Sequence, residues 1–113
     1  MKDKLGLYIH VIFLHTAPSQ PPANLTSSNV TSSSLTFQWT QPLCGSRHGY
    51  IEYYSYTLTS EAGTNTGETF MTTIRVDGLR ANTEYALAVA AWTAFGMGPY
   101  AEKVETTGNN GNL

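Results

Sequence analysis

The sequence predicts an all-β sandwich, and three observations support this. Apolar residues at Tyr85, Leu87, Val89 and Ala91 fall on every second position, which is the period of a strand with one buried face. The segment 35–39 alternates in the same way. Residue types that favour pleated surfaces are abundant, and no stretch of ten or more residues has a convincing amphipathic helical pattern. A chain of 113 residues is enough for one domain core and too short for two.

Charge and composition exclude several classes of function. Charged residues make up 12% of the chain, the formal net charge is −2, and the six basic residues are scattered. Nucleic-acid phosphates require clustered Lys and Arg, so we expect no nucleic-acid partner. Three histidines, one cysteine and the aspartates Asp3 and Asp77 offer little for acid–base or metal chemistry. We therefore expect no enzyme activity and no cofactor.

The N-terminus resembles a secretory leader. A lysine-flanked start at 1–4 precedes an apolar run at 5–14, which Gly6 and His10 interrupt, and small residues follow at 16–17. The run is too short to span a bilayer, which takes roughly 20 residues. The alternatives are a strand left from a preceding domain and an artefact of fragment boundaries.

The first half of the chain predicts three strands. A proline-rich linker at 18–23 leads into a first strand at 24–26, and Val30 is the one core candidate of the polar stretch that follows. The second strand, 35–39, stops before Pro42. The third covers 50–59, with Tyr53 facing outward. Its inward residues are expected to be Tyr54, Tyr56 and Leu58.

The second half predicts a polar loop at 61–67 and a strand at 70–76. The inward residues of that strand are Ile74 and Val76. A turn at Asp77-Gly78 and a polar corner at Asn82-Thr83 then lead into the alternating strand that begins at Tyr85. The ring of Tyr85 can be buried there while its hydroxyl reaches an upstream backbone group, as in a tyrosine corner.

The chain ends with one more strand. Gly96-Met97-Gly98-Pro99 allows a tight turn, and Pro99 opens a last strand at 100–107, whose inward residue is Val104. The remaining residues, 108–113, read as a flexible tail or the start of a linker.

Separate features in this order resemble a fibronectin type III domain over residues 21–107. They are Pro21-Pro22, Trp39, Tyr54, the corner at 79–85 and the Gly96-Met97-Gly98-Pro99 turn. The resemblance implies a seven-stranded antiparallel Greek-key sandwich of immunoglobulin type. Residues 1–20 then form the leader and linker, and 108–113 the tail. The core that the resemblance and the alternation predict comprises Trp39, Tyr54, Leu79, Tyr85, Leu87 and Val89.

Candidate sites are few. Asn24-Leu25-Thr26 and Asn29-Val30-Thr31 are glycosylation acceptors if the chain is secreted, with Asn24 and Asn29 as the modified residues. Cys44 and His48 lie four residues apart, but no third ligand and no oxyanion pocket can be named, so we expect a free thiol.

The segment from Trp92 to Met97 is the best candidate for a partner-contact loop. Trp92, Phe95 and Met97 are residue types enriched at interfaces. The alternative is that one or two of them cover the end of the core. An Arg-Gly-Asp triplet and a Trp-Ser-x-Trp-Ser box, which some members of the resembled family carry, are absent, and the latter argues against a hormone receptor.

The resemblance implies a non-catalytic extracellular binding, adhesion or spacer module from a larger cell-surface or matrix protein. Its partners would be proteins, including neighbouring tandem domains, and the chain itself would hold no membrane span. The alternative is an ectodomain fragment of a receptor tyrosine phosphatase or kinase whose catalytic domain lies outside this chain. A bacterial spacer in a carbohydrate-active enzyme agrees less well with two acceptor triplets and a leader-like start.

Overall fold

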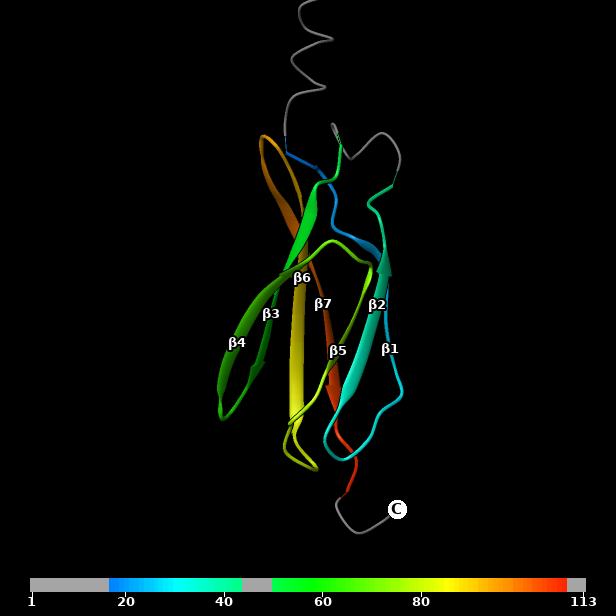
Figure 1. The fold of residues 1–113 in the computed structure, drawn as a ribbon, viewed down its shortest axis with the longest axis vertical. Coiled ribbons are helices and arrows are strands. Elements are labelled where there is room, and N and C mark those ends of the chain that lie inside the picture. Colours follow the sequence, from blue (N-terminus) through cyan, green and yellow to red (C-terminus); the bar gives the residue numbers. More distant parts are fainter. Residues whose placement is uncertain (1–16, 44–49, 110–113) are drawn as a thin grey trace, which may run out of the picture.

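The computed structural model describes residues 17–43 and 50–109, which form seven β-strands in two antiparallel sheets (Figure 1). The leader at 1–16, Cys44, His48 and the tail at 110–113 lie outside these residues. The strands are β1 (Ala23–Ser28), β2 (Leu35–Thr40), β3 (Tyr53–Ser60), β4 (Gly63–Thr69), β5 (Thr73–Val76), β6 (Glu84–Thr93) and β7 (Gly96–Thr106).

The topology is that of a Greek-key sandwich. One sheet has the order β1-β2-β5 and the other β4-β3-β6-β7, so the chain changes sheet between β2 and β3, between β4 and β5, and between β5 and β6. Figure 1 shows the described chain entering the sandwich at one end, in blue, and leaving at the opposite end, in red. The predicted all-β class and two-sheet architecture are confirmed.

Side chains that alternate along the strands of both sheets fill the core. Leu35, Phe37 and Trp39 face inward from β2, and the rings of Trp39 and Tyr54 meet edge to face with centroids 5.5 Å apart. The buried cluster comprises Leu35, Phe37, Trp39, Tyr54, Leu58, Tyr85, Leu87, Val89 and Ala91. Partly buried residues around it are Leu25, Ile51, Tyr56, Ile74, Val76, Leu79 and Ala101.

A tyrosine corner anchors the connection between β5 and β6. The backbone N–H of Arg80 donates a hydrogen bond of 2.9 Å to the hydroxyl of Tyr85, whose ring is buried. The backbone N–H of Leu79 donates to the carbonyl of Ser33 at 2.9 Å, which ties the same connection to the start of β2. The hydroxyl of Tyr85 therefore has the backbone partner that the sequence predicted.

The segment before β1 packs on the sandwich. Pro18 is buried against Gly98 of β7. A Cβ atom added at Gly98 would lie 2.8 Å from the Cβ of Pro18 and 2.9 Å from the carbonyl oxygen of Pro18. Only glycine allows this approach without a shift of the chain. The contacts of the sandwich therefore extend upstream of residue 21.

The prediction of a loop at 61–67 is wrong. The turn is only Glu61-Ala62, and β4 pairs with β3 from Ser60 opposite Gly63 to Tyr54 opposite Thr69. β4 is an edge strand composed of Gly, Thr, Asn and Glu, so it carries no apolar alternation that could identify it as a strand.

The strand predicted at 70–76 is shorter than expected. Only Thr73–Val76 forms β5, whereas Phe70 and Met71 are exposed in the connection from β4. The last strand, in contrast, begins earlier than predicted, at Gly96, and continues through Pro99. Pro99 is tolerated because β7 is an edge strand and its register with β6 shifts at this point.

Val30 and Val104 are not core residues. Val30 is exposed in the connection between β1 and β2, which closes through a 3.1 Å hydrogen bond from the Thr31 N–H to the Ser34 carbonyl. Val104 is 53% exposed because it pairs with Ala86 on the face of the sheet that points away from the core. The inward positions of β7 hold Lys103 and Glu105 instead, and inward charges on an edge strand discourage pairing with other chains.

Candidate protein-contact surface

Three neighbouring strands place a row of large side chains on the outer side of the four-stranded sheet. Residues directly opposite each other on paired strands share a face. Tyr53 of β3 lies opposite Trp92 of β6, and Trp92 lies opposite Met97 of β7. We call the side of this sheet that points away from the core the outer sheet face.

Trp92 is held in place by two contacts. Its ring stacks on that of Tyr53, with centroids 5.4 Å apart and an interplanar angle of 10°. Its Nε1–H donates a 2.9 Å hydrogen bond to Oγ of Ser55, also on β3. Trp92 is half-buried and does not belong to the buried cluster, so it covers Tyr53 rather than the end of the core.

Phe95 and Met97 are displayed by the hairpin between β6 and β7. The turn residues are Ala94 and Phe95, and Gly96 adopts a φ of 141°, in a region that favours glycine. Phe95 is 59% exposed and Met97 39% exposed. Trp92 and Met97 therefore lie on the outer sheet face, and Phe95 is exposed in the turn at the end of their hairpin.

Two further aromatic residues share this face and were not among the predicted contact residues. Tyr53 was predicted to face outward, and its neighbour in the structure is Trp92. Tyr100 lies opposite Ala90 of β6 and is exposed. The register that aligns these residues comes from strand pairing and leaves no local signal in the sequence.

Carboxylates lie close to the aromatic pair. The pKa of Tyr53 is raised above its ordinary value of 10.0, first by partial burial and then by the charges of Glu68 and Glu52. Glu68 lies on β4 directly opposite Ser55, the residue that binds the indole of Trp92.

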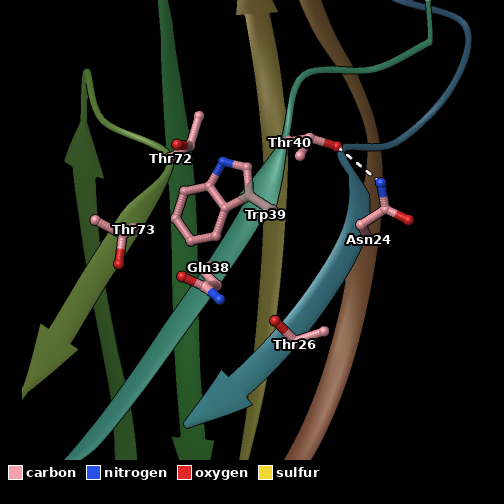
Figure 2. A pocket seen from close by; sticks show the side chains of 7 residues that line it. All are labelled: Asn24, Thr26, Gln38, Trp39, Thr40, Thr72 and Thr73. Atoms are coloured by element: carbon pink, nitrogen blue, oxygen red, sulfur yellow. Dashed lines mark hydrogen bonds between the residues drawn. The ribbon is translucent and has the colours of Figure 1, made fainter.

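A hollow lies on the three-stranded sheet, and its lining is uncharged (Figure 2). The Asn24 side-chain amide donates a 3.2 Å hydrogen bond to Thr40 Oγ1, which donates to the Ala23 carbonyl at 3.1 Å. The hollow is lined by Asn24, Thr26, Gln38, Trp39, Thr40, Thr72 and Thr73. The buried Nε1–H of Trp39 has no hydrogen-bond partner among the described residues.

Both acceptor asparagines are exposed. Asn24 lies at the start of β1 with a φ of 57°, and Asn29 lies just after β1 with a φ of 49°. Asparagine tolerates this left-handed region better than most residues. The described structure therefore leaves both side chains at the surface.

The structure brings together no metal site in the part of the chain that it describes. Among residues 17–43 and 50–109, no group of three or more His, Cys, Asp or Glu side chains could hold an ion. In the same residues, no helix has the length and apolar character needed to cross a membrane.

The two packed antiparallel sheets, the Greek-key crossovers and the tyrosine corner define an immunoglobulin-like β-sandwich domain. Residues 20–107 match the family described as Fibronectin type III domain. The chain belongs to the fibronectin type III family.

Curated relatives include two receptors. The chain is 32% identical to Receptor-type tyrosine-protein phosphatase F of Danio rerio, over 92% of this chain and 6% of that protein. It is 32% identical to Netrin receptor DCC of Mus musculus, over 80% of this chain and 6% of that protein. Titin of Drosophila melanogaster is 32% identical over 72% of this chain. The chain spans only a small part of the length of these relatives. The similarity therefore does not assign to this chain the activities that their names state.

Solved structures show the same fold. A redesigned β-sandwich protein superposes with a TM-score of 0.69 at 23% identity, covering 80% of this chain and 96% of that one. A structure of chicken CNTN1 FN1-FN3 domains superposes with a TM-score of 0.68 at 20% identity, covering 83% of this chain and 33% of that one.

Proposed function

We propose that this fibronectin type III module is a non-catalytic protein-contact or spacer unit of a larger cell-surface or matrix protein. The observation that carries the proposal is the end of the outer sheet face, where Met97 is exposed beside the fixed Tyr53–Trp92 pair and Phe95 is exposed in the adjoining turn. Aromatic residues and methionine are enriched at protein interfaces. Tight packing of Trp92 also means that little side-chain entropy remains to be lost on binding.

The ends of the domain support a place in a tandem array. The described chain enters and leaves at opposite ends of the sandwich (Figure 1). Pro18 packs against Gly98, so an upstream neighbour would be attached close to the hairpin that carries Phe95. An upstream domain and a separate partner would therefore bind to adjacent surfaces of this domain.

An extracellular location is part of the proposal. The two receptors among the relatives support it, whereas the name of Titin points to no receptor. The exposure of Asn24 and Asn29 agrees with their use as glycosylation sites in a secreted chain.

A second candidate is an ectodomain fragment of a receptor tyrosine phosphatase or kinase. The similarity to the zebrafish receptor-type phosphatase over 92% of this chain favours it. In that case the gene should encode, downstream, a span of roughly 20 apolar residues and then a catalytic domain. Its absence from the complete transcript would exclude this candidate.

The contact role is tested by binding to a panel of single cell-surface and matrix proteins. The full chain is secreted from eukaryotic cells, multimerised and applied to each protein. We expect the double variant Phe95→Ser/Met97→Ser to lose binding to any partner found. The matched control, Phe70→Ser/Met71→Ser, changes two exposed apolar residues of another connection and should retain it. Equal loss or equal retention in the two variants would contradict the contact role.

A further inference from the structure

We propose that the outer sheet face docks an arginine side chain of a partner protein, held between the Tyr53–Trp92 pair and the carboxylate of Glu68. This inference names the chemistry of the partner and rests on the proposed contact function. Three properties of the face carry it: the aromatic pair, the sign of the charges and a hollow lined by hydrogen-bonding groups.

The aromatic pair provides the surface on which a guanidinium can stack. Tyr53 and Trp92 cover each other on one side, and both remain half-exposed. The indole Nε1–H of Trp92 already donates a hydrogen bond to Ser55, so a ligand can contact Trp92 through the face of its ring. A planar cation over Trp or Tyr is attracted by the ring quadrupole, and arginine makes this contact more often than lysine.

The charges on this face have one sign. Glu68, Glu84 and Glu102 lie opposite Ser55, Thr106 and Ala88, whose side chains point outward. The three cations in the described residues lie elsewhere. Arg75 is on β5 and pairs with Asp77 at 2.9 Å, Arg80 follows Leu79 in the corner, and Lys103 is on the inward side of β7.

This pattern is complementary to a basic partner. Within residues 17–43 and 50–109, no ion pair neutralises Glu68. The charges of Glu68 and Glu52 add to the effect of partial burial in raising the pKa of Tyr53, which agrees with their position near this ring. An apolar or acidic partner placed over this face would leave the carboxylates without compensation, which costs free energy.

A hollow on the same sheet, whose lining includes the Ser55 that binds the indole of Trp92, has the groups that a guanidinium needs. A guanidinium carries five N–H donors in one plane and accepts nothing. The outward hydroxyls of Ser55, Thr57 and Thr66 and the carboxylate of Glu68 can all accept. Tyr100 of β7 closes the opposite side, so the hollow spans the sheet. Its lining residues are Ser55, Tyr56, Thr57, Thr66, Gly67, Glu68 and Tyr100.

The test is an NMR titration of the isotope-labelled full chain with a defined probe, the peptide acetyl-Gly-Arg-Gly-Arg-Gly-amide. We expect a saturable shift of the Trp92 indole N–H resonance that weakens as salt is added. The control peptide replaces both arginines by citrulline, which has nearly the same shape and no charge. It should give no saturable shift.

Two matched variants locate the site. Glu68→Gln should weaken binding of the arginine peptide about two- to five-fold, the range of an exposed ion pair. Glu84→Gln removes the same charge at the far end of the same face and should leave binding unchanged. Both glutamates are exposed, so both variants should unfold at the wild-type temperature, which a thermal melt checks.

Several results would overturn the inference: no saturable shift, an equal shift with the citrulline peptide, a stronger shift with the corresponding lysine peptide, or equal weakening by the two variants. The outcomes also separate the inference from the proposed function. A partner whose binding needs Phe95 and Met97 but is unaffected by Glu68→Gln and by the arginine peptide would refute the inference alone. A saturable arginine site without any partner in the panel would count against the contact function alone.

Discussion

Replacement of Tyr85 by phenylalanine removes one hydroxyl and leaves the buried ring in place. That hydroxyl accepts the 2.9 Å hydrogen bond from the backbone N–H of Arg80, in a partly buried setting. The variant therefore loses one hydrogen bond and leaves a backbone donor without its acceptor. We expect a loss of about 1–3 kcal/mol in the free energy of unfolding, the usual cost of leaving such a donor unsatisfied.

The assay is urea and thermal unfolding of Tyr85→Phe beside Tyr100→Phe. Tyr100 is an exposed residue of an edge strand, so its change should stay within about 0.5 kcal/mol. For a domain of this size, each 1 kcal/mol lowers the melting temperature by about 4–8 °C. Equal stability of the two variants would show that the corner hydrogen bond does not hold the connection between β5 and β6.

The remaining predictions address the core, the upstream segment and acid stability. Trp39→Ala should cost about 3–5 kcal/mol, measured by urea unfolding, because Trp39 is 3% exposed and would leave a cavity. A wild-type midpoint would refute its core role. Gly98→Val should displace Pro18 and speed limited proteolysis there, whereas Gly108→Ala, with its nearest atom at 3.5 Å, should not. The pKa of Glu105 lies below its ordinary 4.5, first because Ser27 donates to it and then because of the Thr106 backbone N–H. The ionised Glu105 therefore stabilises the fold above about pH 4.5, and this stability is lost as the pH falls through the lowered pKa. Ser27→Ala should raise the pKa of Glu105 and reduce the loss of stability at acid pH. NMR titration measures the pKa and acid unfolding measures the stability. An unchanged pKa would show that the Ser27 hydrogen bond does not lower it.

Strands with one buried apolar face could be predicted from the sequence. The alternation of β2 and β6 is strong because each strand has the core on one side, and the corner before Tyr85 follows from its polar residues. These elements lie at the centre of their sheets, where burial dictates side-chain identity.

The edge strand β4 and the inward face of the edge strand β7 could not be predicted, for a physical reason. β4 is stabilised by backbone pairing with β3 and buries little, so its Gly and Thr residues resemble a loop. On β7 Val104 faces solvent whereas Lys103 and Glu105 face inward, because an edge strand is only partly covered. At the edge of a sheet, an apolar residue therefore does not reliably mark the side of the strand that faces the core.

The candidate contact surface was predicted only in part. Trp92, Phe95 and Met97 are close in sequence, so their clustering was evident. The contributions of Tyr53, Glu68 and Tyr100 depend on the register of four strands, which brings together residues from distant parts of the chain.

The central claim is that this domain acts outside the cell as a protein-contact module. Its most direct test is the intact mass and N-terminal sequence of the chain after expression in secreting eukaryotic cells. We predict a start near Pro18 or Ser19 and added mass at Asn24 or Asn29. A retained Met1 without added sugar would contradict the extracellular assignment.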